Sequence, residues 1–234
     1  MWDRRRPLAL AAVILLLPGL VMALWAMSSP DAVTGLVPPQ FLWVTEAEST
    51  DQGLGAVGLA GFSTFVLVNN IRVALMAFVA GITWGVGTAL LVGYNGLLLG
   101  GLTGLAAQAG NLALLGEATL AHGLLELSCI VVAGGAGLSL GRALLRPDHL
   151  TRREAMAAEA RRSLLIAAGT APWLVVAGLV EGYASRVGLS LLPTSLIGLA
   201  LGGAFWSLVW WRGRPSETGP AFGAQVGRHA LPGQ

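Results

Sequence analysis

The sequence predicts an all-α, polytopic membrane protein: a helix bundle of about six transmembrane helices whose N and C termini are both cytoplasmic. Of its 234 residues, 55% are hydrophobic and only 11% are charged, and the mean hydropathy is +0.71. That composition leaves too little polar surface to cover a soluble protein of this size, whereas a bilayer solvates the apolar excess. A second observation is that several apolar segments approach the roughly 20 residues that a helix needs to cross a hydrocarbon core of about 30 Å.

The apolar segments predict spans near residues 8–27, 71–92, 96–115, 123–144, 164–180 and 193–211. The first span follows three arginines, so a secretory signal is the alternative there. Its apolar run is longer than the usual core of about 7–15 residues, and no clean A-x-A cleavage site follows. We therefore expect a retained N-terminal anchor over residues 1–27.

The distribution of arginine, the third observation, orients these spans. All 14 basic residues are arginine, and cytoplasmic loops of membrane proteins are enriched in basic residues. With both ends inside, the expected cytoplasmic set is Arg4, Arg5, Arg6, Arg142, Arg146, Arg152, Arg153, Arg161, Arg162, Arg212, Arg214 and Arg228. Only Arg72 and Arg186 then lie toward the exterior.

Between the spans we expect three less apolar regions. Residues 28–65 form a short external loop, in which Pro38-Pro39 makes an irregular start and the stretch from Phe41 onward is a candidate interfacial helix. Residues 66–211 form the membrane bundle and include an arginine-rich cytoplasmic loop, 145–163. In it, Thr151 and Glu154 fit a capping box that starts a solvated helix; contact with anionic headgroups or a cytosolic partner is the alternative. The tail, 212–234, is predicted to be disordered.

Small residues recur at four-residue spacing in several spans. Such stripes let helix backbones approach closely, which matters because lipid supplies no hydrophobic drive for helix association. We expect most of them to pack within the chain, although a homo-oligomer is an alternative use. The predicted packing residues are Ala77, Gly81 and Gly85; Gly96, Gly100 and Gly104; and Ala133, Gly137 and Gly141.

Polar residues gather toward the external ends of three predicted spans, and they are Asn69, Asn70, Arg72, His122, Glu126 and Glu181. His122 and Glu126 are four residues apart and therefore share a helix face. Ionisable groups near a bilayer are costly unless they pair or meet water. We therefore expect either a structural clasp, with Arg72 facing Glu126 or Glu181, or a ligand site. An imidazole beside Glu126 would also titrate near neutral pH.

The sequence speaks against several classes of function. A zinc site needs three or four ligands, and His149 and His229 are predicted on the opposite side of the membrane from His122. No nucleophile elbow, Walker loop or dinucleotide fingerprint is present, and the arginines do not form a nucleic-acid-binding face. The single cysteine, Cys129, lies in an apolar stretch and suits small-residue packing. We expect no enzyme activity, no cofactor and no metal.

Four separated motifs resemble the stage II sporulation protein M family of integral membrane proteins. They are Asn69-Asn70-Ile71-Arg72-Val73-Ala74-Leu75-Met76-Ala77-Phe78; Asn95-Gly96 with Gly100; His122-Gly123-Leu124-Leu125-Glu126-Leu127 followed by Ala133-Gly134-Gly135-Ala136-Gly137; and Ala177-Gly178-Leu179-Val180-Glu181-Gly182. The resemblance covers residues 62–186. One departure is Ser128, where the family commonly has proline, which removes a source of kinking near Glu126.

The resemblance implies a multi-helix integral membrane protein of the bacterial inner membrane. The namesake of this family looks like a scaffold that holds a peptidoglycan-degrading complex. The resemblance therefore implies that the partners are membrane lipid and envelope proteins. Any cell-wall cleavage would then belong to a partner. The alternative function is a transporter or channel component that binds a small ion or polar solute at the six external polar residues named above.

Overall fold

The computed structural model describes residues 5–45 and 56–213, and this part of the chain contains helices and no strand. The long helices are α1 (Arg5–Ser28), α3 (Ala56–Val79), α4 (Val86–Gln108), α5 (Leu112–Leu145), α6 (Arg152–Ala168), α7 (Ala171–Val187) and α8 (Leu191–Gly213). Shorter helices are α2 (Pro30–Thr34), η2 (Pro39–Thr45) and η3 (Ala80–Ile82).

Five helical stretches of the described residues are long and apolar enough to cross a membrane. A sixth passage is α3, whose 24 residues correspond to about 36 Å at 1.5 Å per residue. The chain is therefore a multi-pass membrane helix bundle, and about six spans are confirmed.

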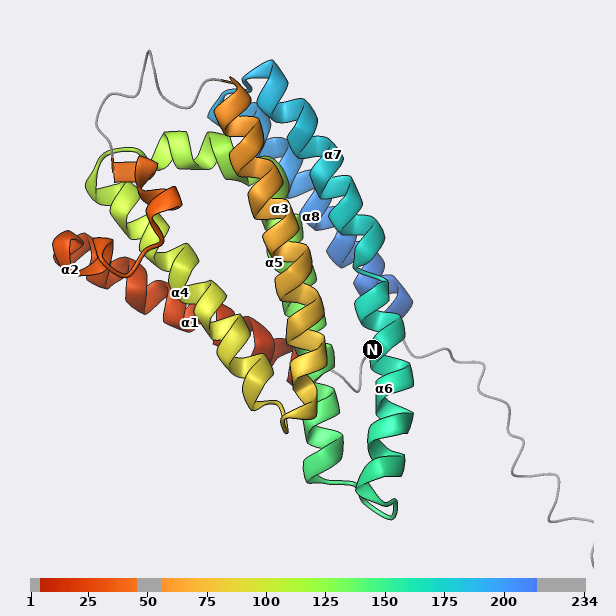
Figure 1. Ribbon diagram of the computed structural model, residues 1–234. Coiled ribbons are helices and arrows are strands. Elements are labelled where there is room, and N and C mark those ends of the chain that lie inside the picture. Colours follow the sequence, from red (N-terminus) through yellow and green to blue (C-terminus); the bar gives the residue numbers. More distant parts are fainter. Residues whose placement is uncertain (1–4, 46–55, 214–234) are drawn as a thin grey trace, which may run out of the picture.

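Helix α5 is the centre of the bundle. It contacts α1, α3, α4, α6, α7 and α8. Figure 1 shows its first turns running across the top of the molecule before the helix descends between the others. Its 34 residues correspond to about 51 Å along the helix path, which exceeds the thickness of a bilayer core, and the transverse first turns take up part of this length.

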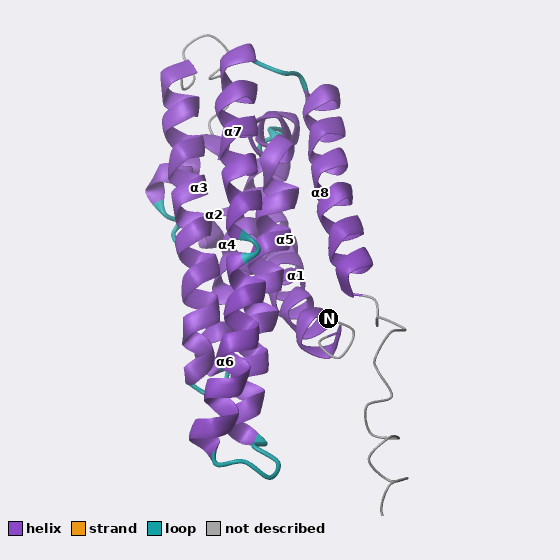
Figure 2. Cartoon of the chain, turned by 90° about the vertical axis from the view of Figure 1, so that its right-hand side faces the viewer, coloured by secondary structure: helices purple, strands orange, loops and turns teal. Residues whose placement is uncertain are grey.

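Around α5 the helices form two groups (Figures 1 and 2). On one side α1 and α4 make the most extensive helix pair in the structure. On the other side α3, α7 and α8 pack against α5. The predicted interfacial helix after Phe41 is instead the short 3₁₀ helix η2, which packs against α4 and buries Phe41 and Val44. The rest of that predicted helix lies partly outside the described residues.

The chain alternates direction in the order that the arginine pattern predicts. The start of α1, the α5–α6 turn and the end of α8 all lie toward the lower half of Figure 1. These three places carry Arg5 and Arg6; Arg142, Arg146, Arg152 and Arg153; and Arg212. By the positive-inside rule, this arginine-rich end is the one expected to face the cytoplasm. The predicted disordered tail falls almost entirely on residues 214–234, which lie outside the described part.

The predicted boundaries of the second and third spans are wrong. Helix α3 runs from Ala56 to Val79, so residues 56–65 belong to a helix and not to the external loop, and α4 begins at Val86. The turn between them contains Trp84 and Gly85 in the left-handed region, at φ 55° and 84°. Because this turn is itself apolar, a hydropathy pattern runs through it without a break. The third span likewise ends at Gln108 and not at residue 115.

The predicted fifth span, 164–180, is also interrupted. Helix α6 ends at Ala168 and α7 begins at Ala171, with a proline in its first turn. Pro172 lacks a backbone N–H and is well tolerated in the first turn of a helix, where that N–H would have no intrahelical partner. The predicted capping box is confirmed, because Thr151 and Glu154 form it reciprocally at the start of α6.

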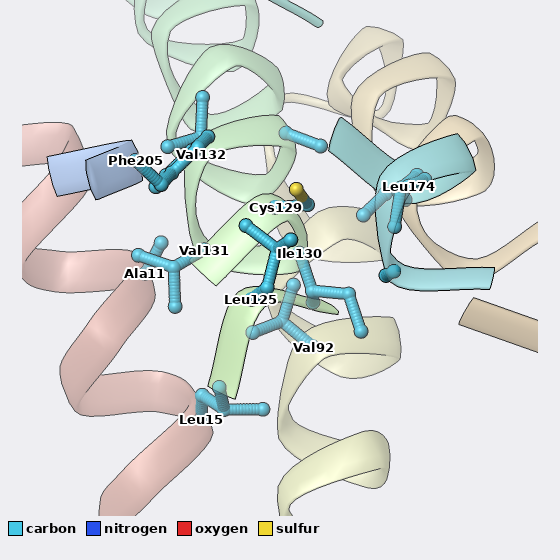
Figure 3. Close-up of a cluster of buried hydrophobic side chains, with 14 residues drawn as sticks. Ala11, Leu15, Val92, Leu125, Cys129, Ile130, Val131, Val132, Leu174 and Phe205 are labelled. Atoms are coloured by element: carbon cyan, nitrogen blue, oxygen red, sulfur yellow. The ribbon is translucent and has the colours of Figure 1, made fainter. Parts of the chain in front are cut away.

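Figure 3 shows the apolar core where the two groups of helices meet. Ala11 and Leu15 of α1 and Val92 of α4 approach α5 from one side. Phe205 of α8 also lies on the side of α1, and Leu174 of α7 approaches α5 from the opposite side. The middle of the bundle is therefore filled by apolar side chains from six helices, because Ala74 and Ala77 of α3 also belong to this core.

Glycines set the distances between the backbones. Within the α1–α4 pair, a Cβ on Gly104 would lie 2.6 Å from Cβ of Ala26, and one on Gly19 would lie 2.9 Å from the carbonyl oxygen of Gly96. Real Cβ contacts are not this short, so only glycine fits. The stripe of Ala77, Gly81 and Gly85 does not lie on one continuous helix, yet Ala77 and Gly81 contact Gly137 and Gly85 contacts Gly141 of α5.

Candidate functional site

Four of the six predicted polar residues come together inside the bundle. Asn70 comes from α3, His122 and Glu126 from α5, and Glu181 from α7. All four residues are buried: the exposed fraction is 7% for Asn70, 1% for His122, 1% for Glu126 and 6% for Glu181. We call these four residues the polar cluster.

Two contacts hold the polar cluster together. The Asn70 side-chain amide donates a hydrogen bond through Nδ2 to Oε2 of Glu126. His122 contacts Oε2 of Glu181 through Nδ1. Helix α5 is therefore joined to α3 by one polar contact and to α7 by the other, only one helical turn apart.

The predicted role of Arg72 is wrong. Its side chain is exposed, and among the described residues no ion pair joins it to Glu126 or Glu181. It is the seventeenth of the 24 residues of α3, about 24 Å from the start of the helix at 1.5 Å per residue. Arg72 therefore lies nearer the arginine-rich end than the external end, because α3 starts some 15 residues earlier than predicted. Asn69, beside Asn70 in sequence, is half-buried and stands apart from the two contacts.

The partner of His122 also differs from the prediction. His122 and Glu126 share a face of α5, but the carboxylate in contact with the imidazole is that of Glu181. Sequence spacing shows which residues share one helix face, whereas the partner across the interface depends on how α7 is rotated against α5.

Two buried atoms of the polar cluster have no hydrogen-bond partner among the described residues, Nδ1 of His122 and Oε1 of Glu126. Nδ1 of His122 contacts the Glu181 carboxylate, so Oε1 of Glu126 is the acceptor that is left open. With both carboxylates ionised and His122 protonated, the cluster carries one uncompensated negative charge in a poorly hydrated setting. A bound proton, a small monovalent cation or a water molecule would each offset that cost. No group of three metal-ligating side chains occurs in the described residues.

Two neighbouring contacts were not predicted from sequence. Oε1 of Glu117 near the start of α5 accepts a hydrogen bond of 3.1 Å from the backbone N–H of Leu191 at the start of α8. The Asn111 side-chain amide donates a hydrogen bond of 3.0 Å to the carbonyl oxygen of Val44 in η2. The sequence signal for these two contacts was that Glu117 and Asn111 are polar residues beside an apolar segment. Glu117 links the start of α8 to α5, and Asn111 links η2 to the start of α5.

The family model for stage II sporulation protein M matches residues 12–186, which is more than half of the chain. The chain belongs to the stage II sporulation protein M family. No curated protein and no solved structure matches it. The match begins within α1, includes the whole polar cluster and ends one residue before the end of α7, so this stage II sporulation protein M family member carries α8 beyond the matched region.

Proposed function

We propose that this protein is a non-enzymatic assembly platform in the bacterial inner membrane that organises envelope or peptidoglycan-remodelling proteins. The observation that carries the proposal is that the polar cluster fixes three helices to one another above a closed apolar layer. A platform requires a rigid bundle with a defined outer shape, and buried polar contacts between helices favour one arrangement over others.

The layer on the cytoplasmic side of the polar cluster consists of small and apolar residues. Ala77 of α3, Cys129 and Ile130 of α5, and Leu174 and Ala177 of α7 are all at most 4% exposed. A pathway for ions or solutes would require polar groups or water through this layer. The packing therefore supports a sealed bundle over a conducting one.

Membership of the stage II sporulation protein M family supports a membrane role, and the resemblance to a scaffold supports protein partners. The proposed partners lie on the external side, where Glu117 links α5 to the start of α8, while the polar cluster links α5 to α7 deeper in the bundle. In this role the chain holds its partner proteins at a defined place in the envelope, and a bound enzyme performs any bond cleavage.

The test compares Glu126→Gln with Glu126→Leu in the full-length protein. Glutamine keeps a side-chain oxygen that accepts the Asn70 hydrogen bond but carries no charge, whereas leucine leaves the Asn70 amide without an acceptor. For a platform, proteins cross-linked to the chain in intact membranes and identified by mass spectrometry should remain with Glu126→Gln and decrease with Glu126→Leu. The partners should include envelope proteins recovered in fixed ratio to the chain.

The second candidate is a transporter or channel component, and the unpartnered Oε1 of Glu126 is the observation that favours it. For this function the charge of Glu126 matters more than its shape. Proteoliposomes containing the wild-type chain would then show a proton or cation flux that Glu126→Gln abolishes. Such a flux, together with an unchanged set of cross-linked proteins in both variants, would overturn the platform proposal.

A further inference from the structure

A cavity of about 340 Å³ lies at the arginine-rich end of the bundle, far from the polar cluster along α5. It is bounded by the first turns of α1, the turn between α3 and α4, and the last turns of α5. These three segments are distant in sequence, so only the folded bundle forms this cavity.

Three arginines, Arg6 of α1 and Arg142 and Arg146 at the end of α5, line the cavity. All three side chains are exposed, and among the described residues none forms an ion pair with a carboxylate. Three positive charges therefore surround one cavity, and no carboxylate of the described residues pairs with them. The arrangement therefore favours an anion that several guanidinium groups share, as phosphate oxygens are shared in bidentate contacts.

The remaining wall is apolar. Leu10 and Leu138 line the cavity, and Trp84 presents an indole that is 56% exposed. Leu10 continues into the exposed apolar face of α1 through Val13 and Leu17, which lie three and seven residues further along the same helix face. A ligand that fits has an anionic head and a long apolar chain.

We infer that this cavity binds an anionic phospholipid of the cytoplasmic leaflet. The phosphodiester contacts Arg6, Arg142 and Arg146, and one acyl chain lies along Leu10 and the exposed face of α1. Basic pockets between transmembrane helices at the cytoplasmic side suit anionic headgroups, and tryptophan is favoured at the level of lipid headgroups. The inference is independent of the proposed platform function and of the polar cluster.

The experiment measures lipid binding to the full chain in detergent by native mass spectrometry, with phosphatidylglycerol and phosphatidylcholine of identical acyl chains. The test variant is Arg6→Gln with Arg142→Gln. Its matched control is Arg153→Gln with Arg162→Gln, which removes the same charge from exposed positions on α6. Because each basic side chain near an anionic headgroup contributes about fivefold in affinity, we expect the test variant to bind phosphatidylglycerol at least tenfold more weakly. The control should change within about twofold.

Two further measurements distinguish a bound lipid from a bound free anion. Inorganic phosphate should not displace phosphatidylglycerol at millimolar concentration, and Leu10→Asn should weaken lipid binding while both arginines remain. Equal losses in the test and control variants would show general charge attraction and overturn the inference. Displacement by phosphate, or no preference for phosphatidylglycerol over phosphatidylcholine, would overturn it as well. If the double variant is unstable, the single change Arg6→Gln, at an exposed position in the first turn of α1, provides the same comparison at about fivefold.

Discussion

The indole Nε1 of Trp206 on α8 donates a hydrogen bond of 2.9 Å to the hydroxyl oxygen of Ser128 on α5. The Ser128 hydroxyl in turn donates to the carbonyl oxygen of Leu124 at 2.7 Å. Helix α8 lies beyond the residues that the family model matches. The serine thus connects the additional helix to the centre of the bundle.

Ser128→Ala is expected to lower the free energy of unfolding by about 1 kcal/mol, because the Trp206 N–H loses its acceptor in a region shielded from water. Thermal unfolding in detergent, followed by tryptophan fluorescence, measures the change. Ser195→Ala is the control, since that exposed hydroxyl bonds only to the carbonyl of Leu191 in its own helix. An equal effect of the two substitutions would show that the link to α8 contributes no stability.

Glu181→Leu is expected to lower the free energy of unfolding by about 3–5 kcal/mol, because it leaves His122 buried without its carboxylate partner. The double variant His122→Leu with Glu181→Leu should recover most of that loss, since an apolar pair can replace a buried ion pair of similar volume. The measurement is again unfolding in detergent. Asp148→Asn, an exposed acidic residue, serves as the control and should change stability by less than about 0.5 kcal/mol. Strictly additive losses in the double variant would argue against a direct contact.

Gly137→Ala is expected to destabilise the bundle by about 1–3 kcal/mol through overpacking. A Cβ at this position would overlap the carbonyl oxygen of Ala77 and approach Oγ1 of Thr88 to 2.6 Å. The control is Gly182→Ala in α7, where a Cβ meets no atom within 4 Å and alanine should be neutral or slightly stabilising. Comparing melting temperatures of the two variants tests the contact, and a tolerated Gly137→Ala would mean that the α3–α5 interface is looser than described.

The start of α6 should become less stable in acid. Hydrogen bonds from the backbone N–H and hydroxyl of Thr151 lower the pKa of Glu154 below its usual value of 4.5. Because the pKa is lower in the folded state, the stabilisation is complete above pH 4.5 and is lost as the pH falls through the lowered value. The protection factors of the first amides of α6, which are exchange rates corrected for the intrinsic pH dependence of exchange, should therefore fall in acid relative to neutral pH. Thr151→Ala should lower these protection factors at neutral pH and remove most of their further decrease in acid, whereas an unchanged pH dependence of the protection factors in this variant would contradict the assignment.

Hydropathy and arginine placement were sufficient to predict a helical membrane protein with both termini on the arginine-rich side. The same signals misplaced the ends of α3 and α4 by about a dozen residues. In a soluble protein a turn is usually polar, but the turn through Ile82 and Trp84 is as apolar as the helices around it. Because lipid solvates turn and helix alike, average hydropathy does not mark the boundary.

By itself, the sequence determined the class of the protein and the shared helix face of His122 and Glu126, since these follow from composition and helical period. Only the tertiary structure decided that His122 contacts Glu181, that Asn70 bonds to Glu126 and that Arg72 lies outside the cluster. Such pairings depend on the depth and rotation of each helix, which are set by close backbone contacts such as Gly137 with Ala77. Those contacts join residues too far apart in sequence for any local pattern to specify.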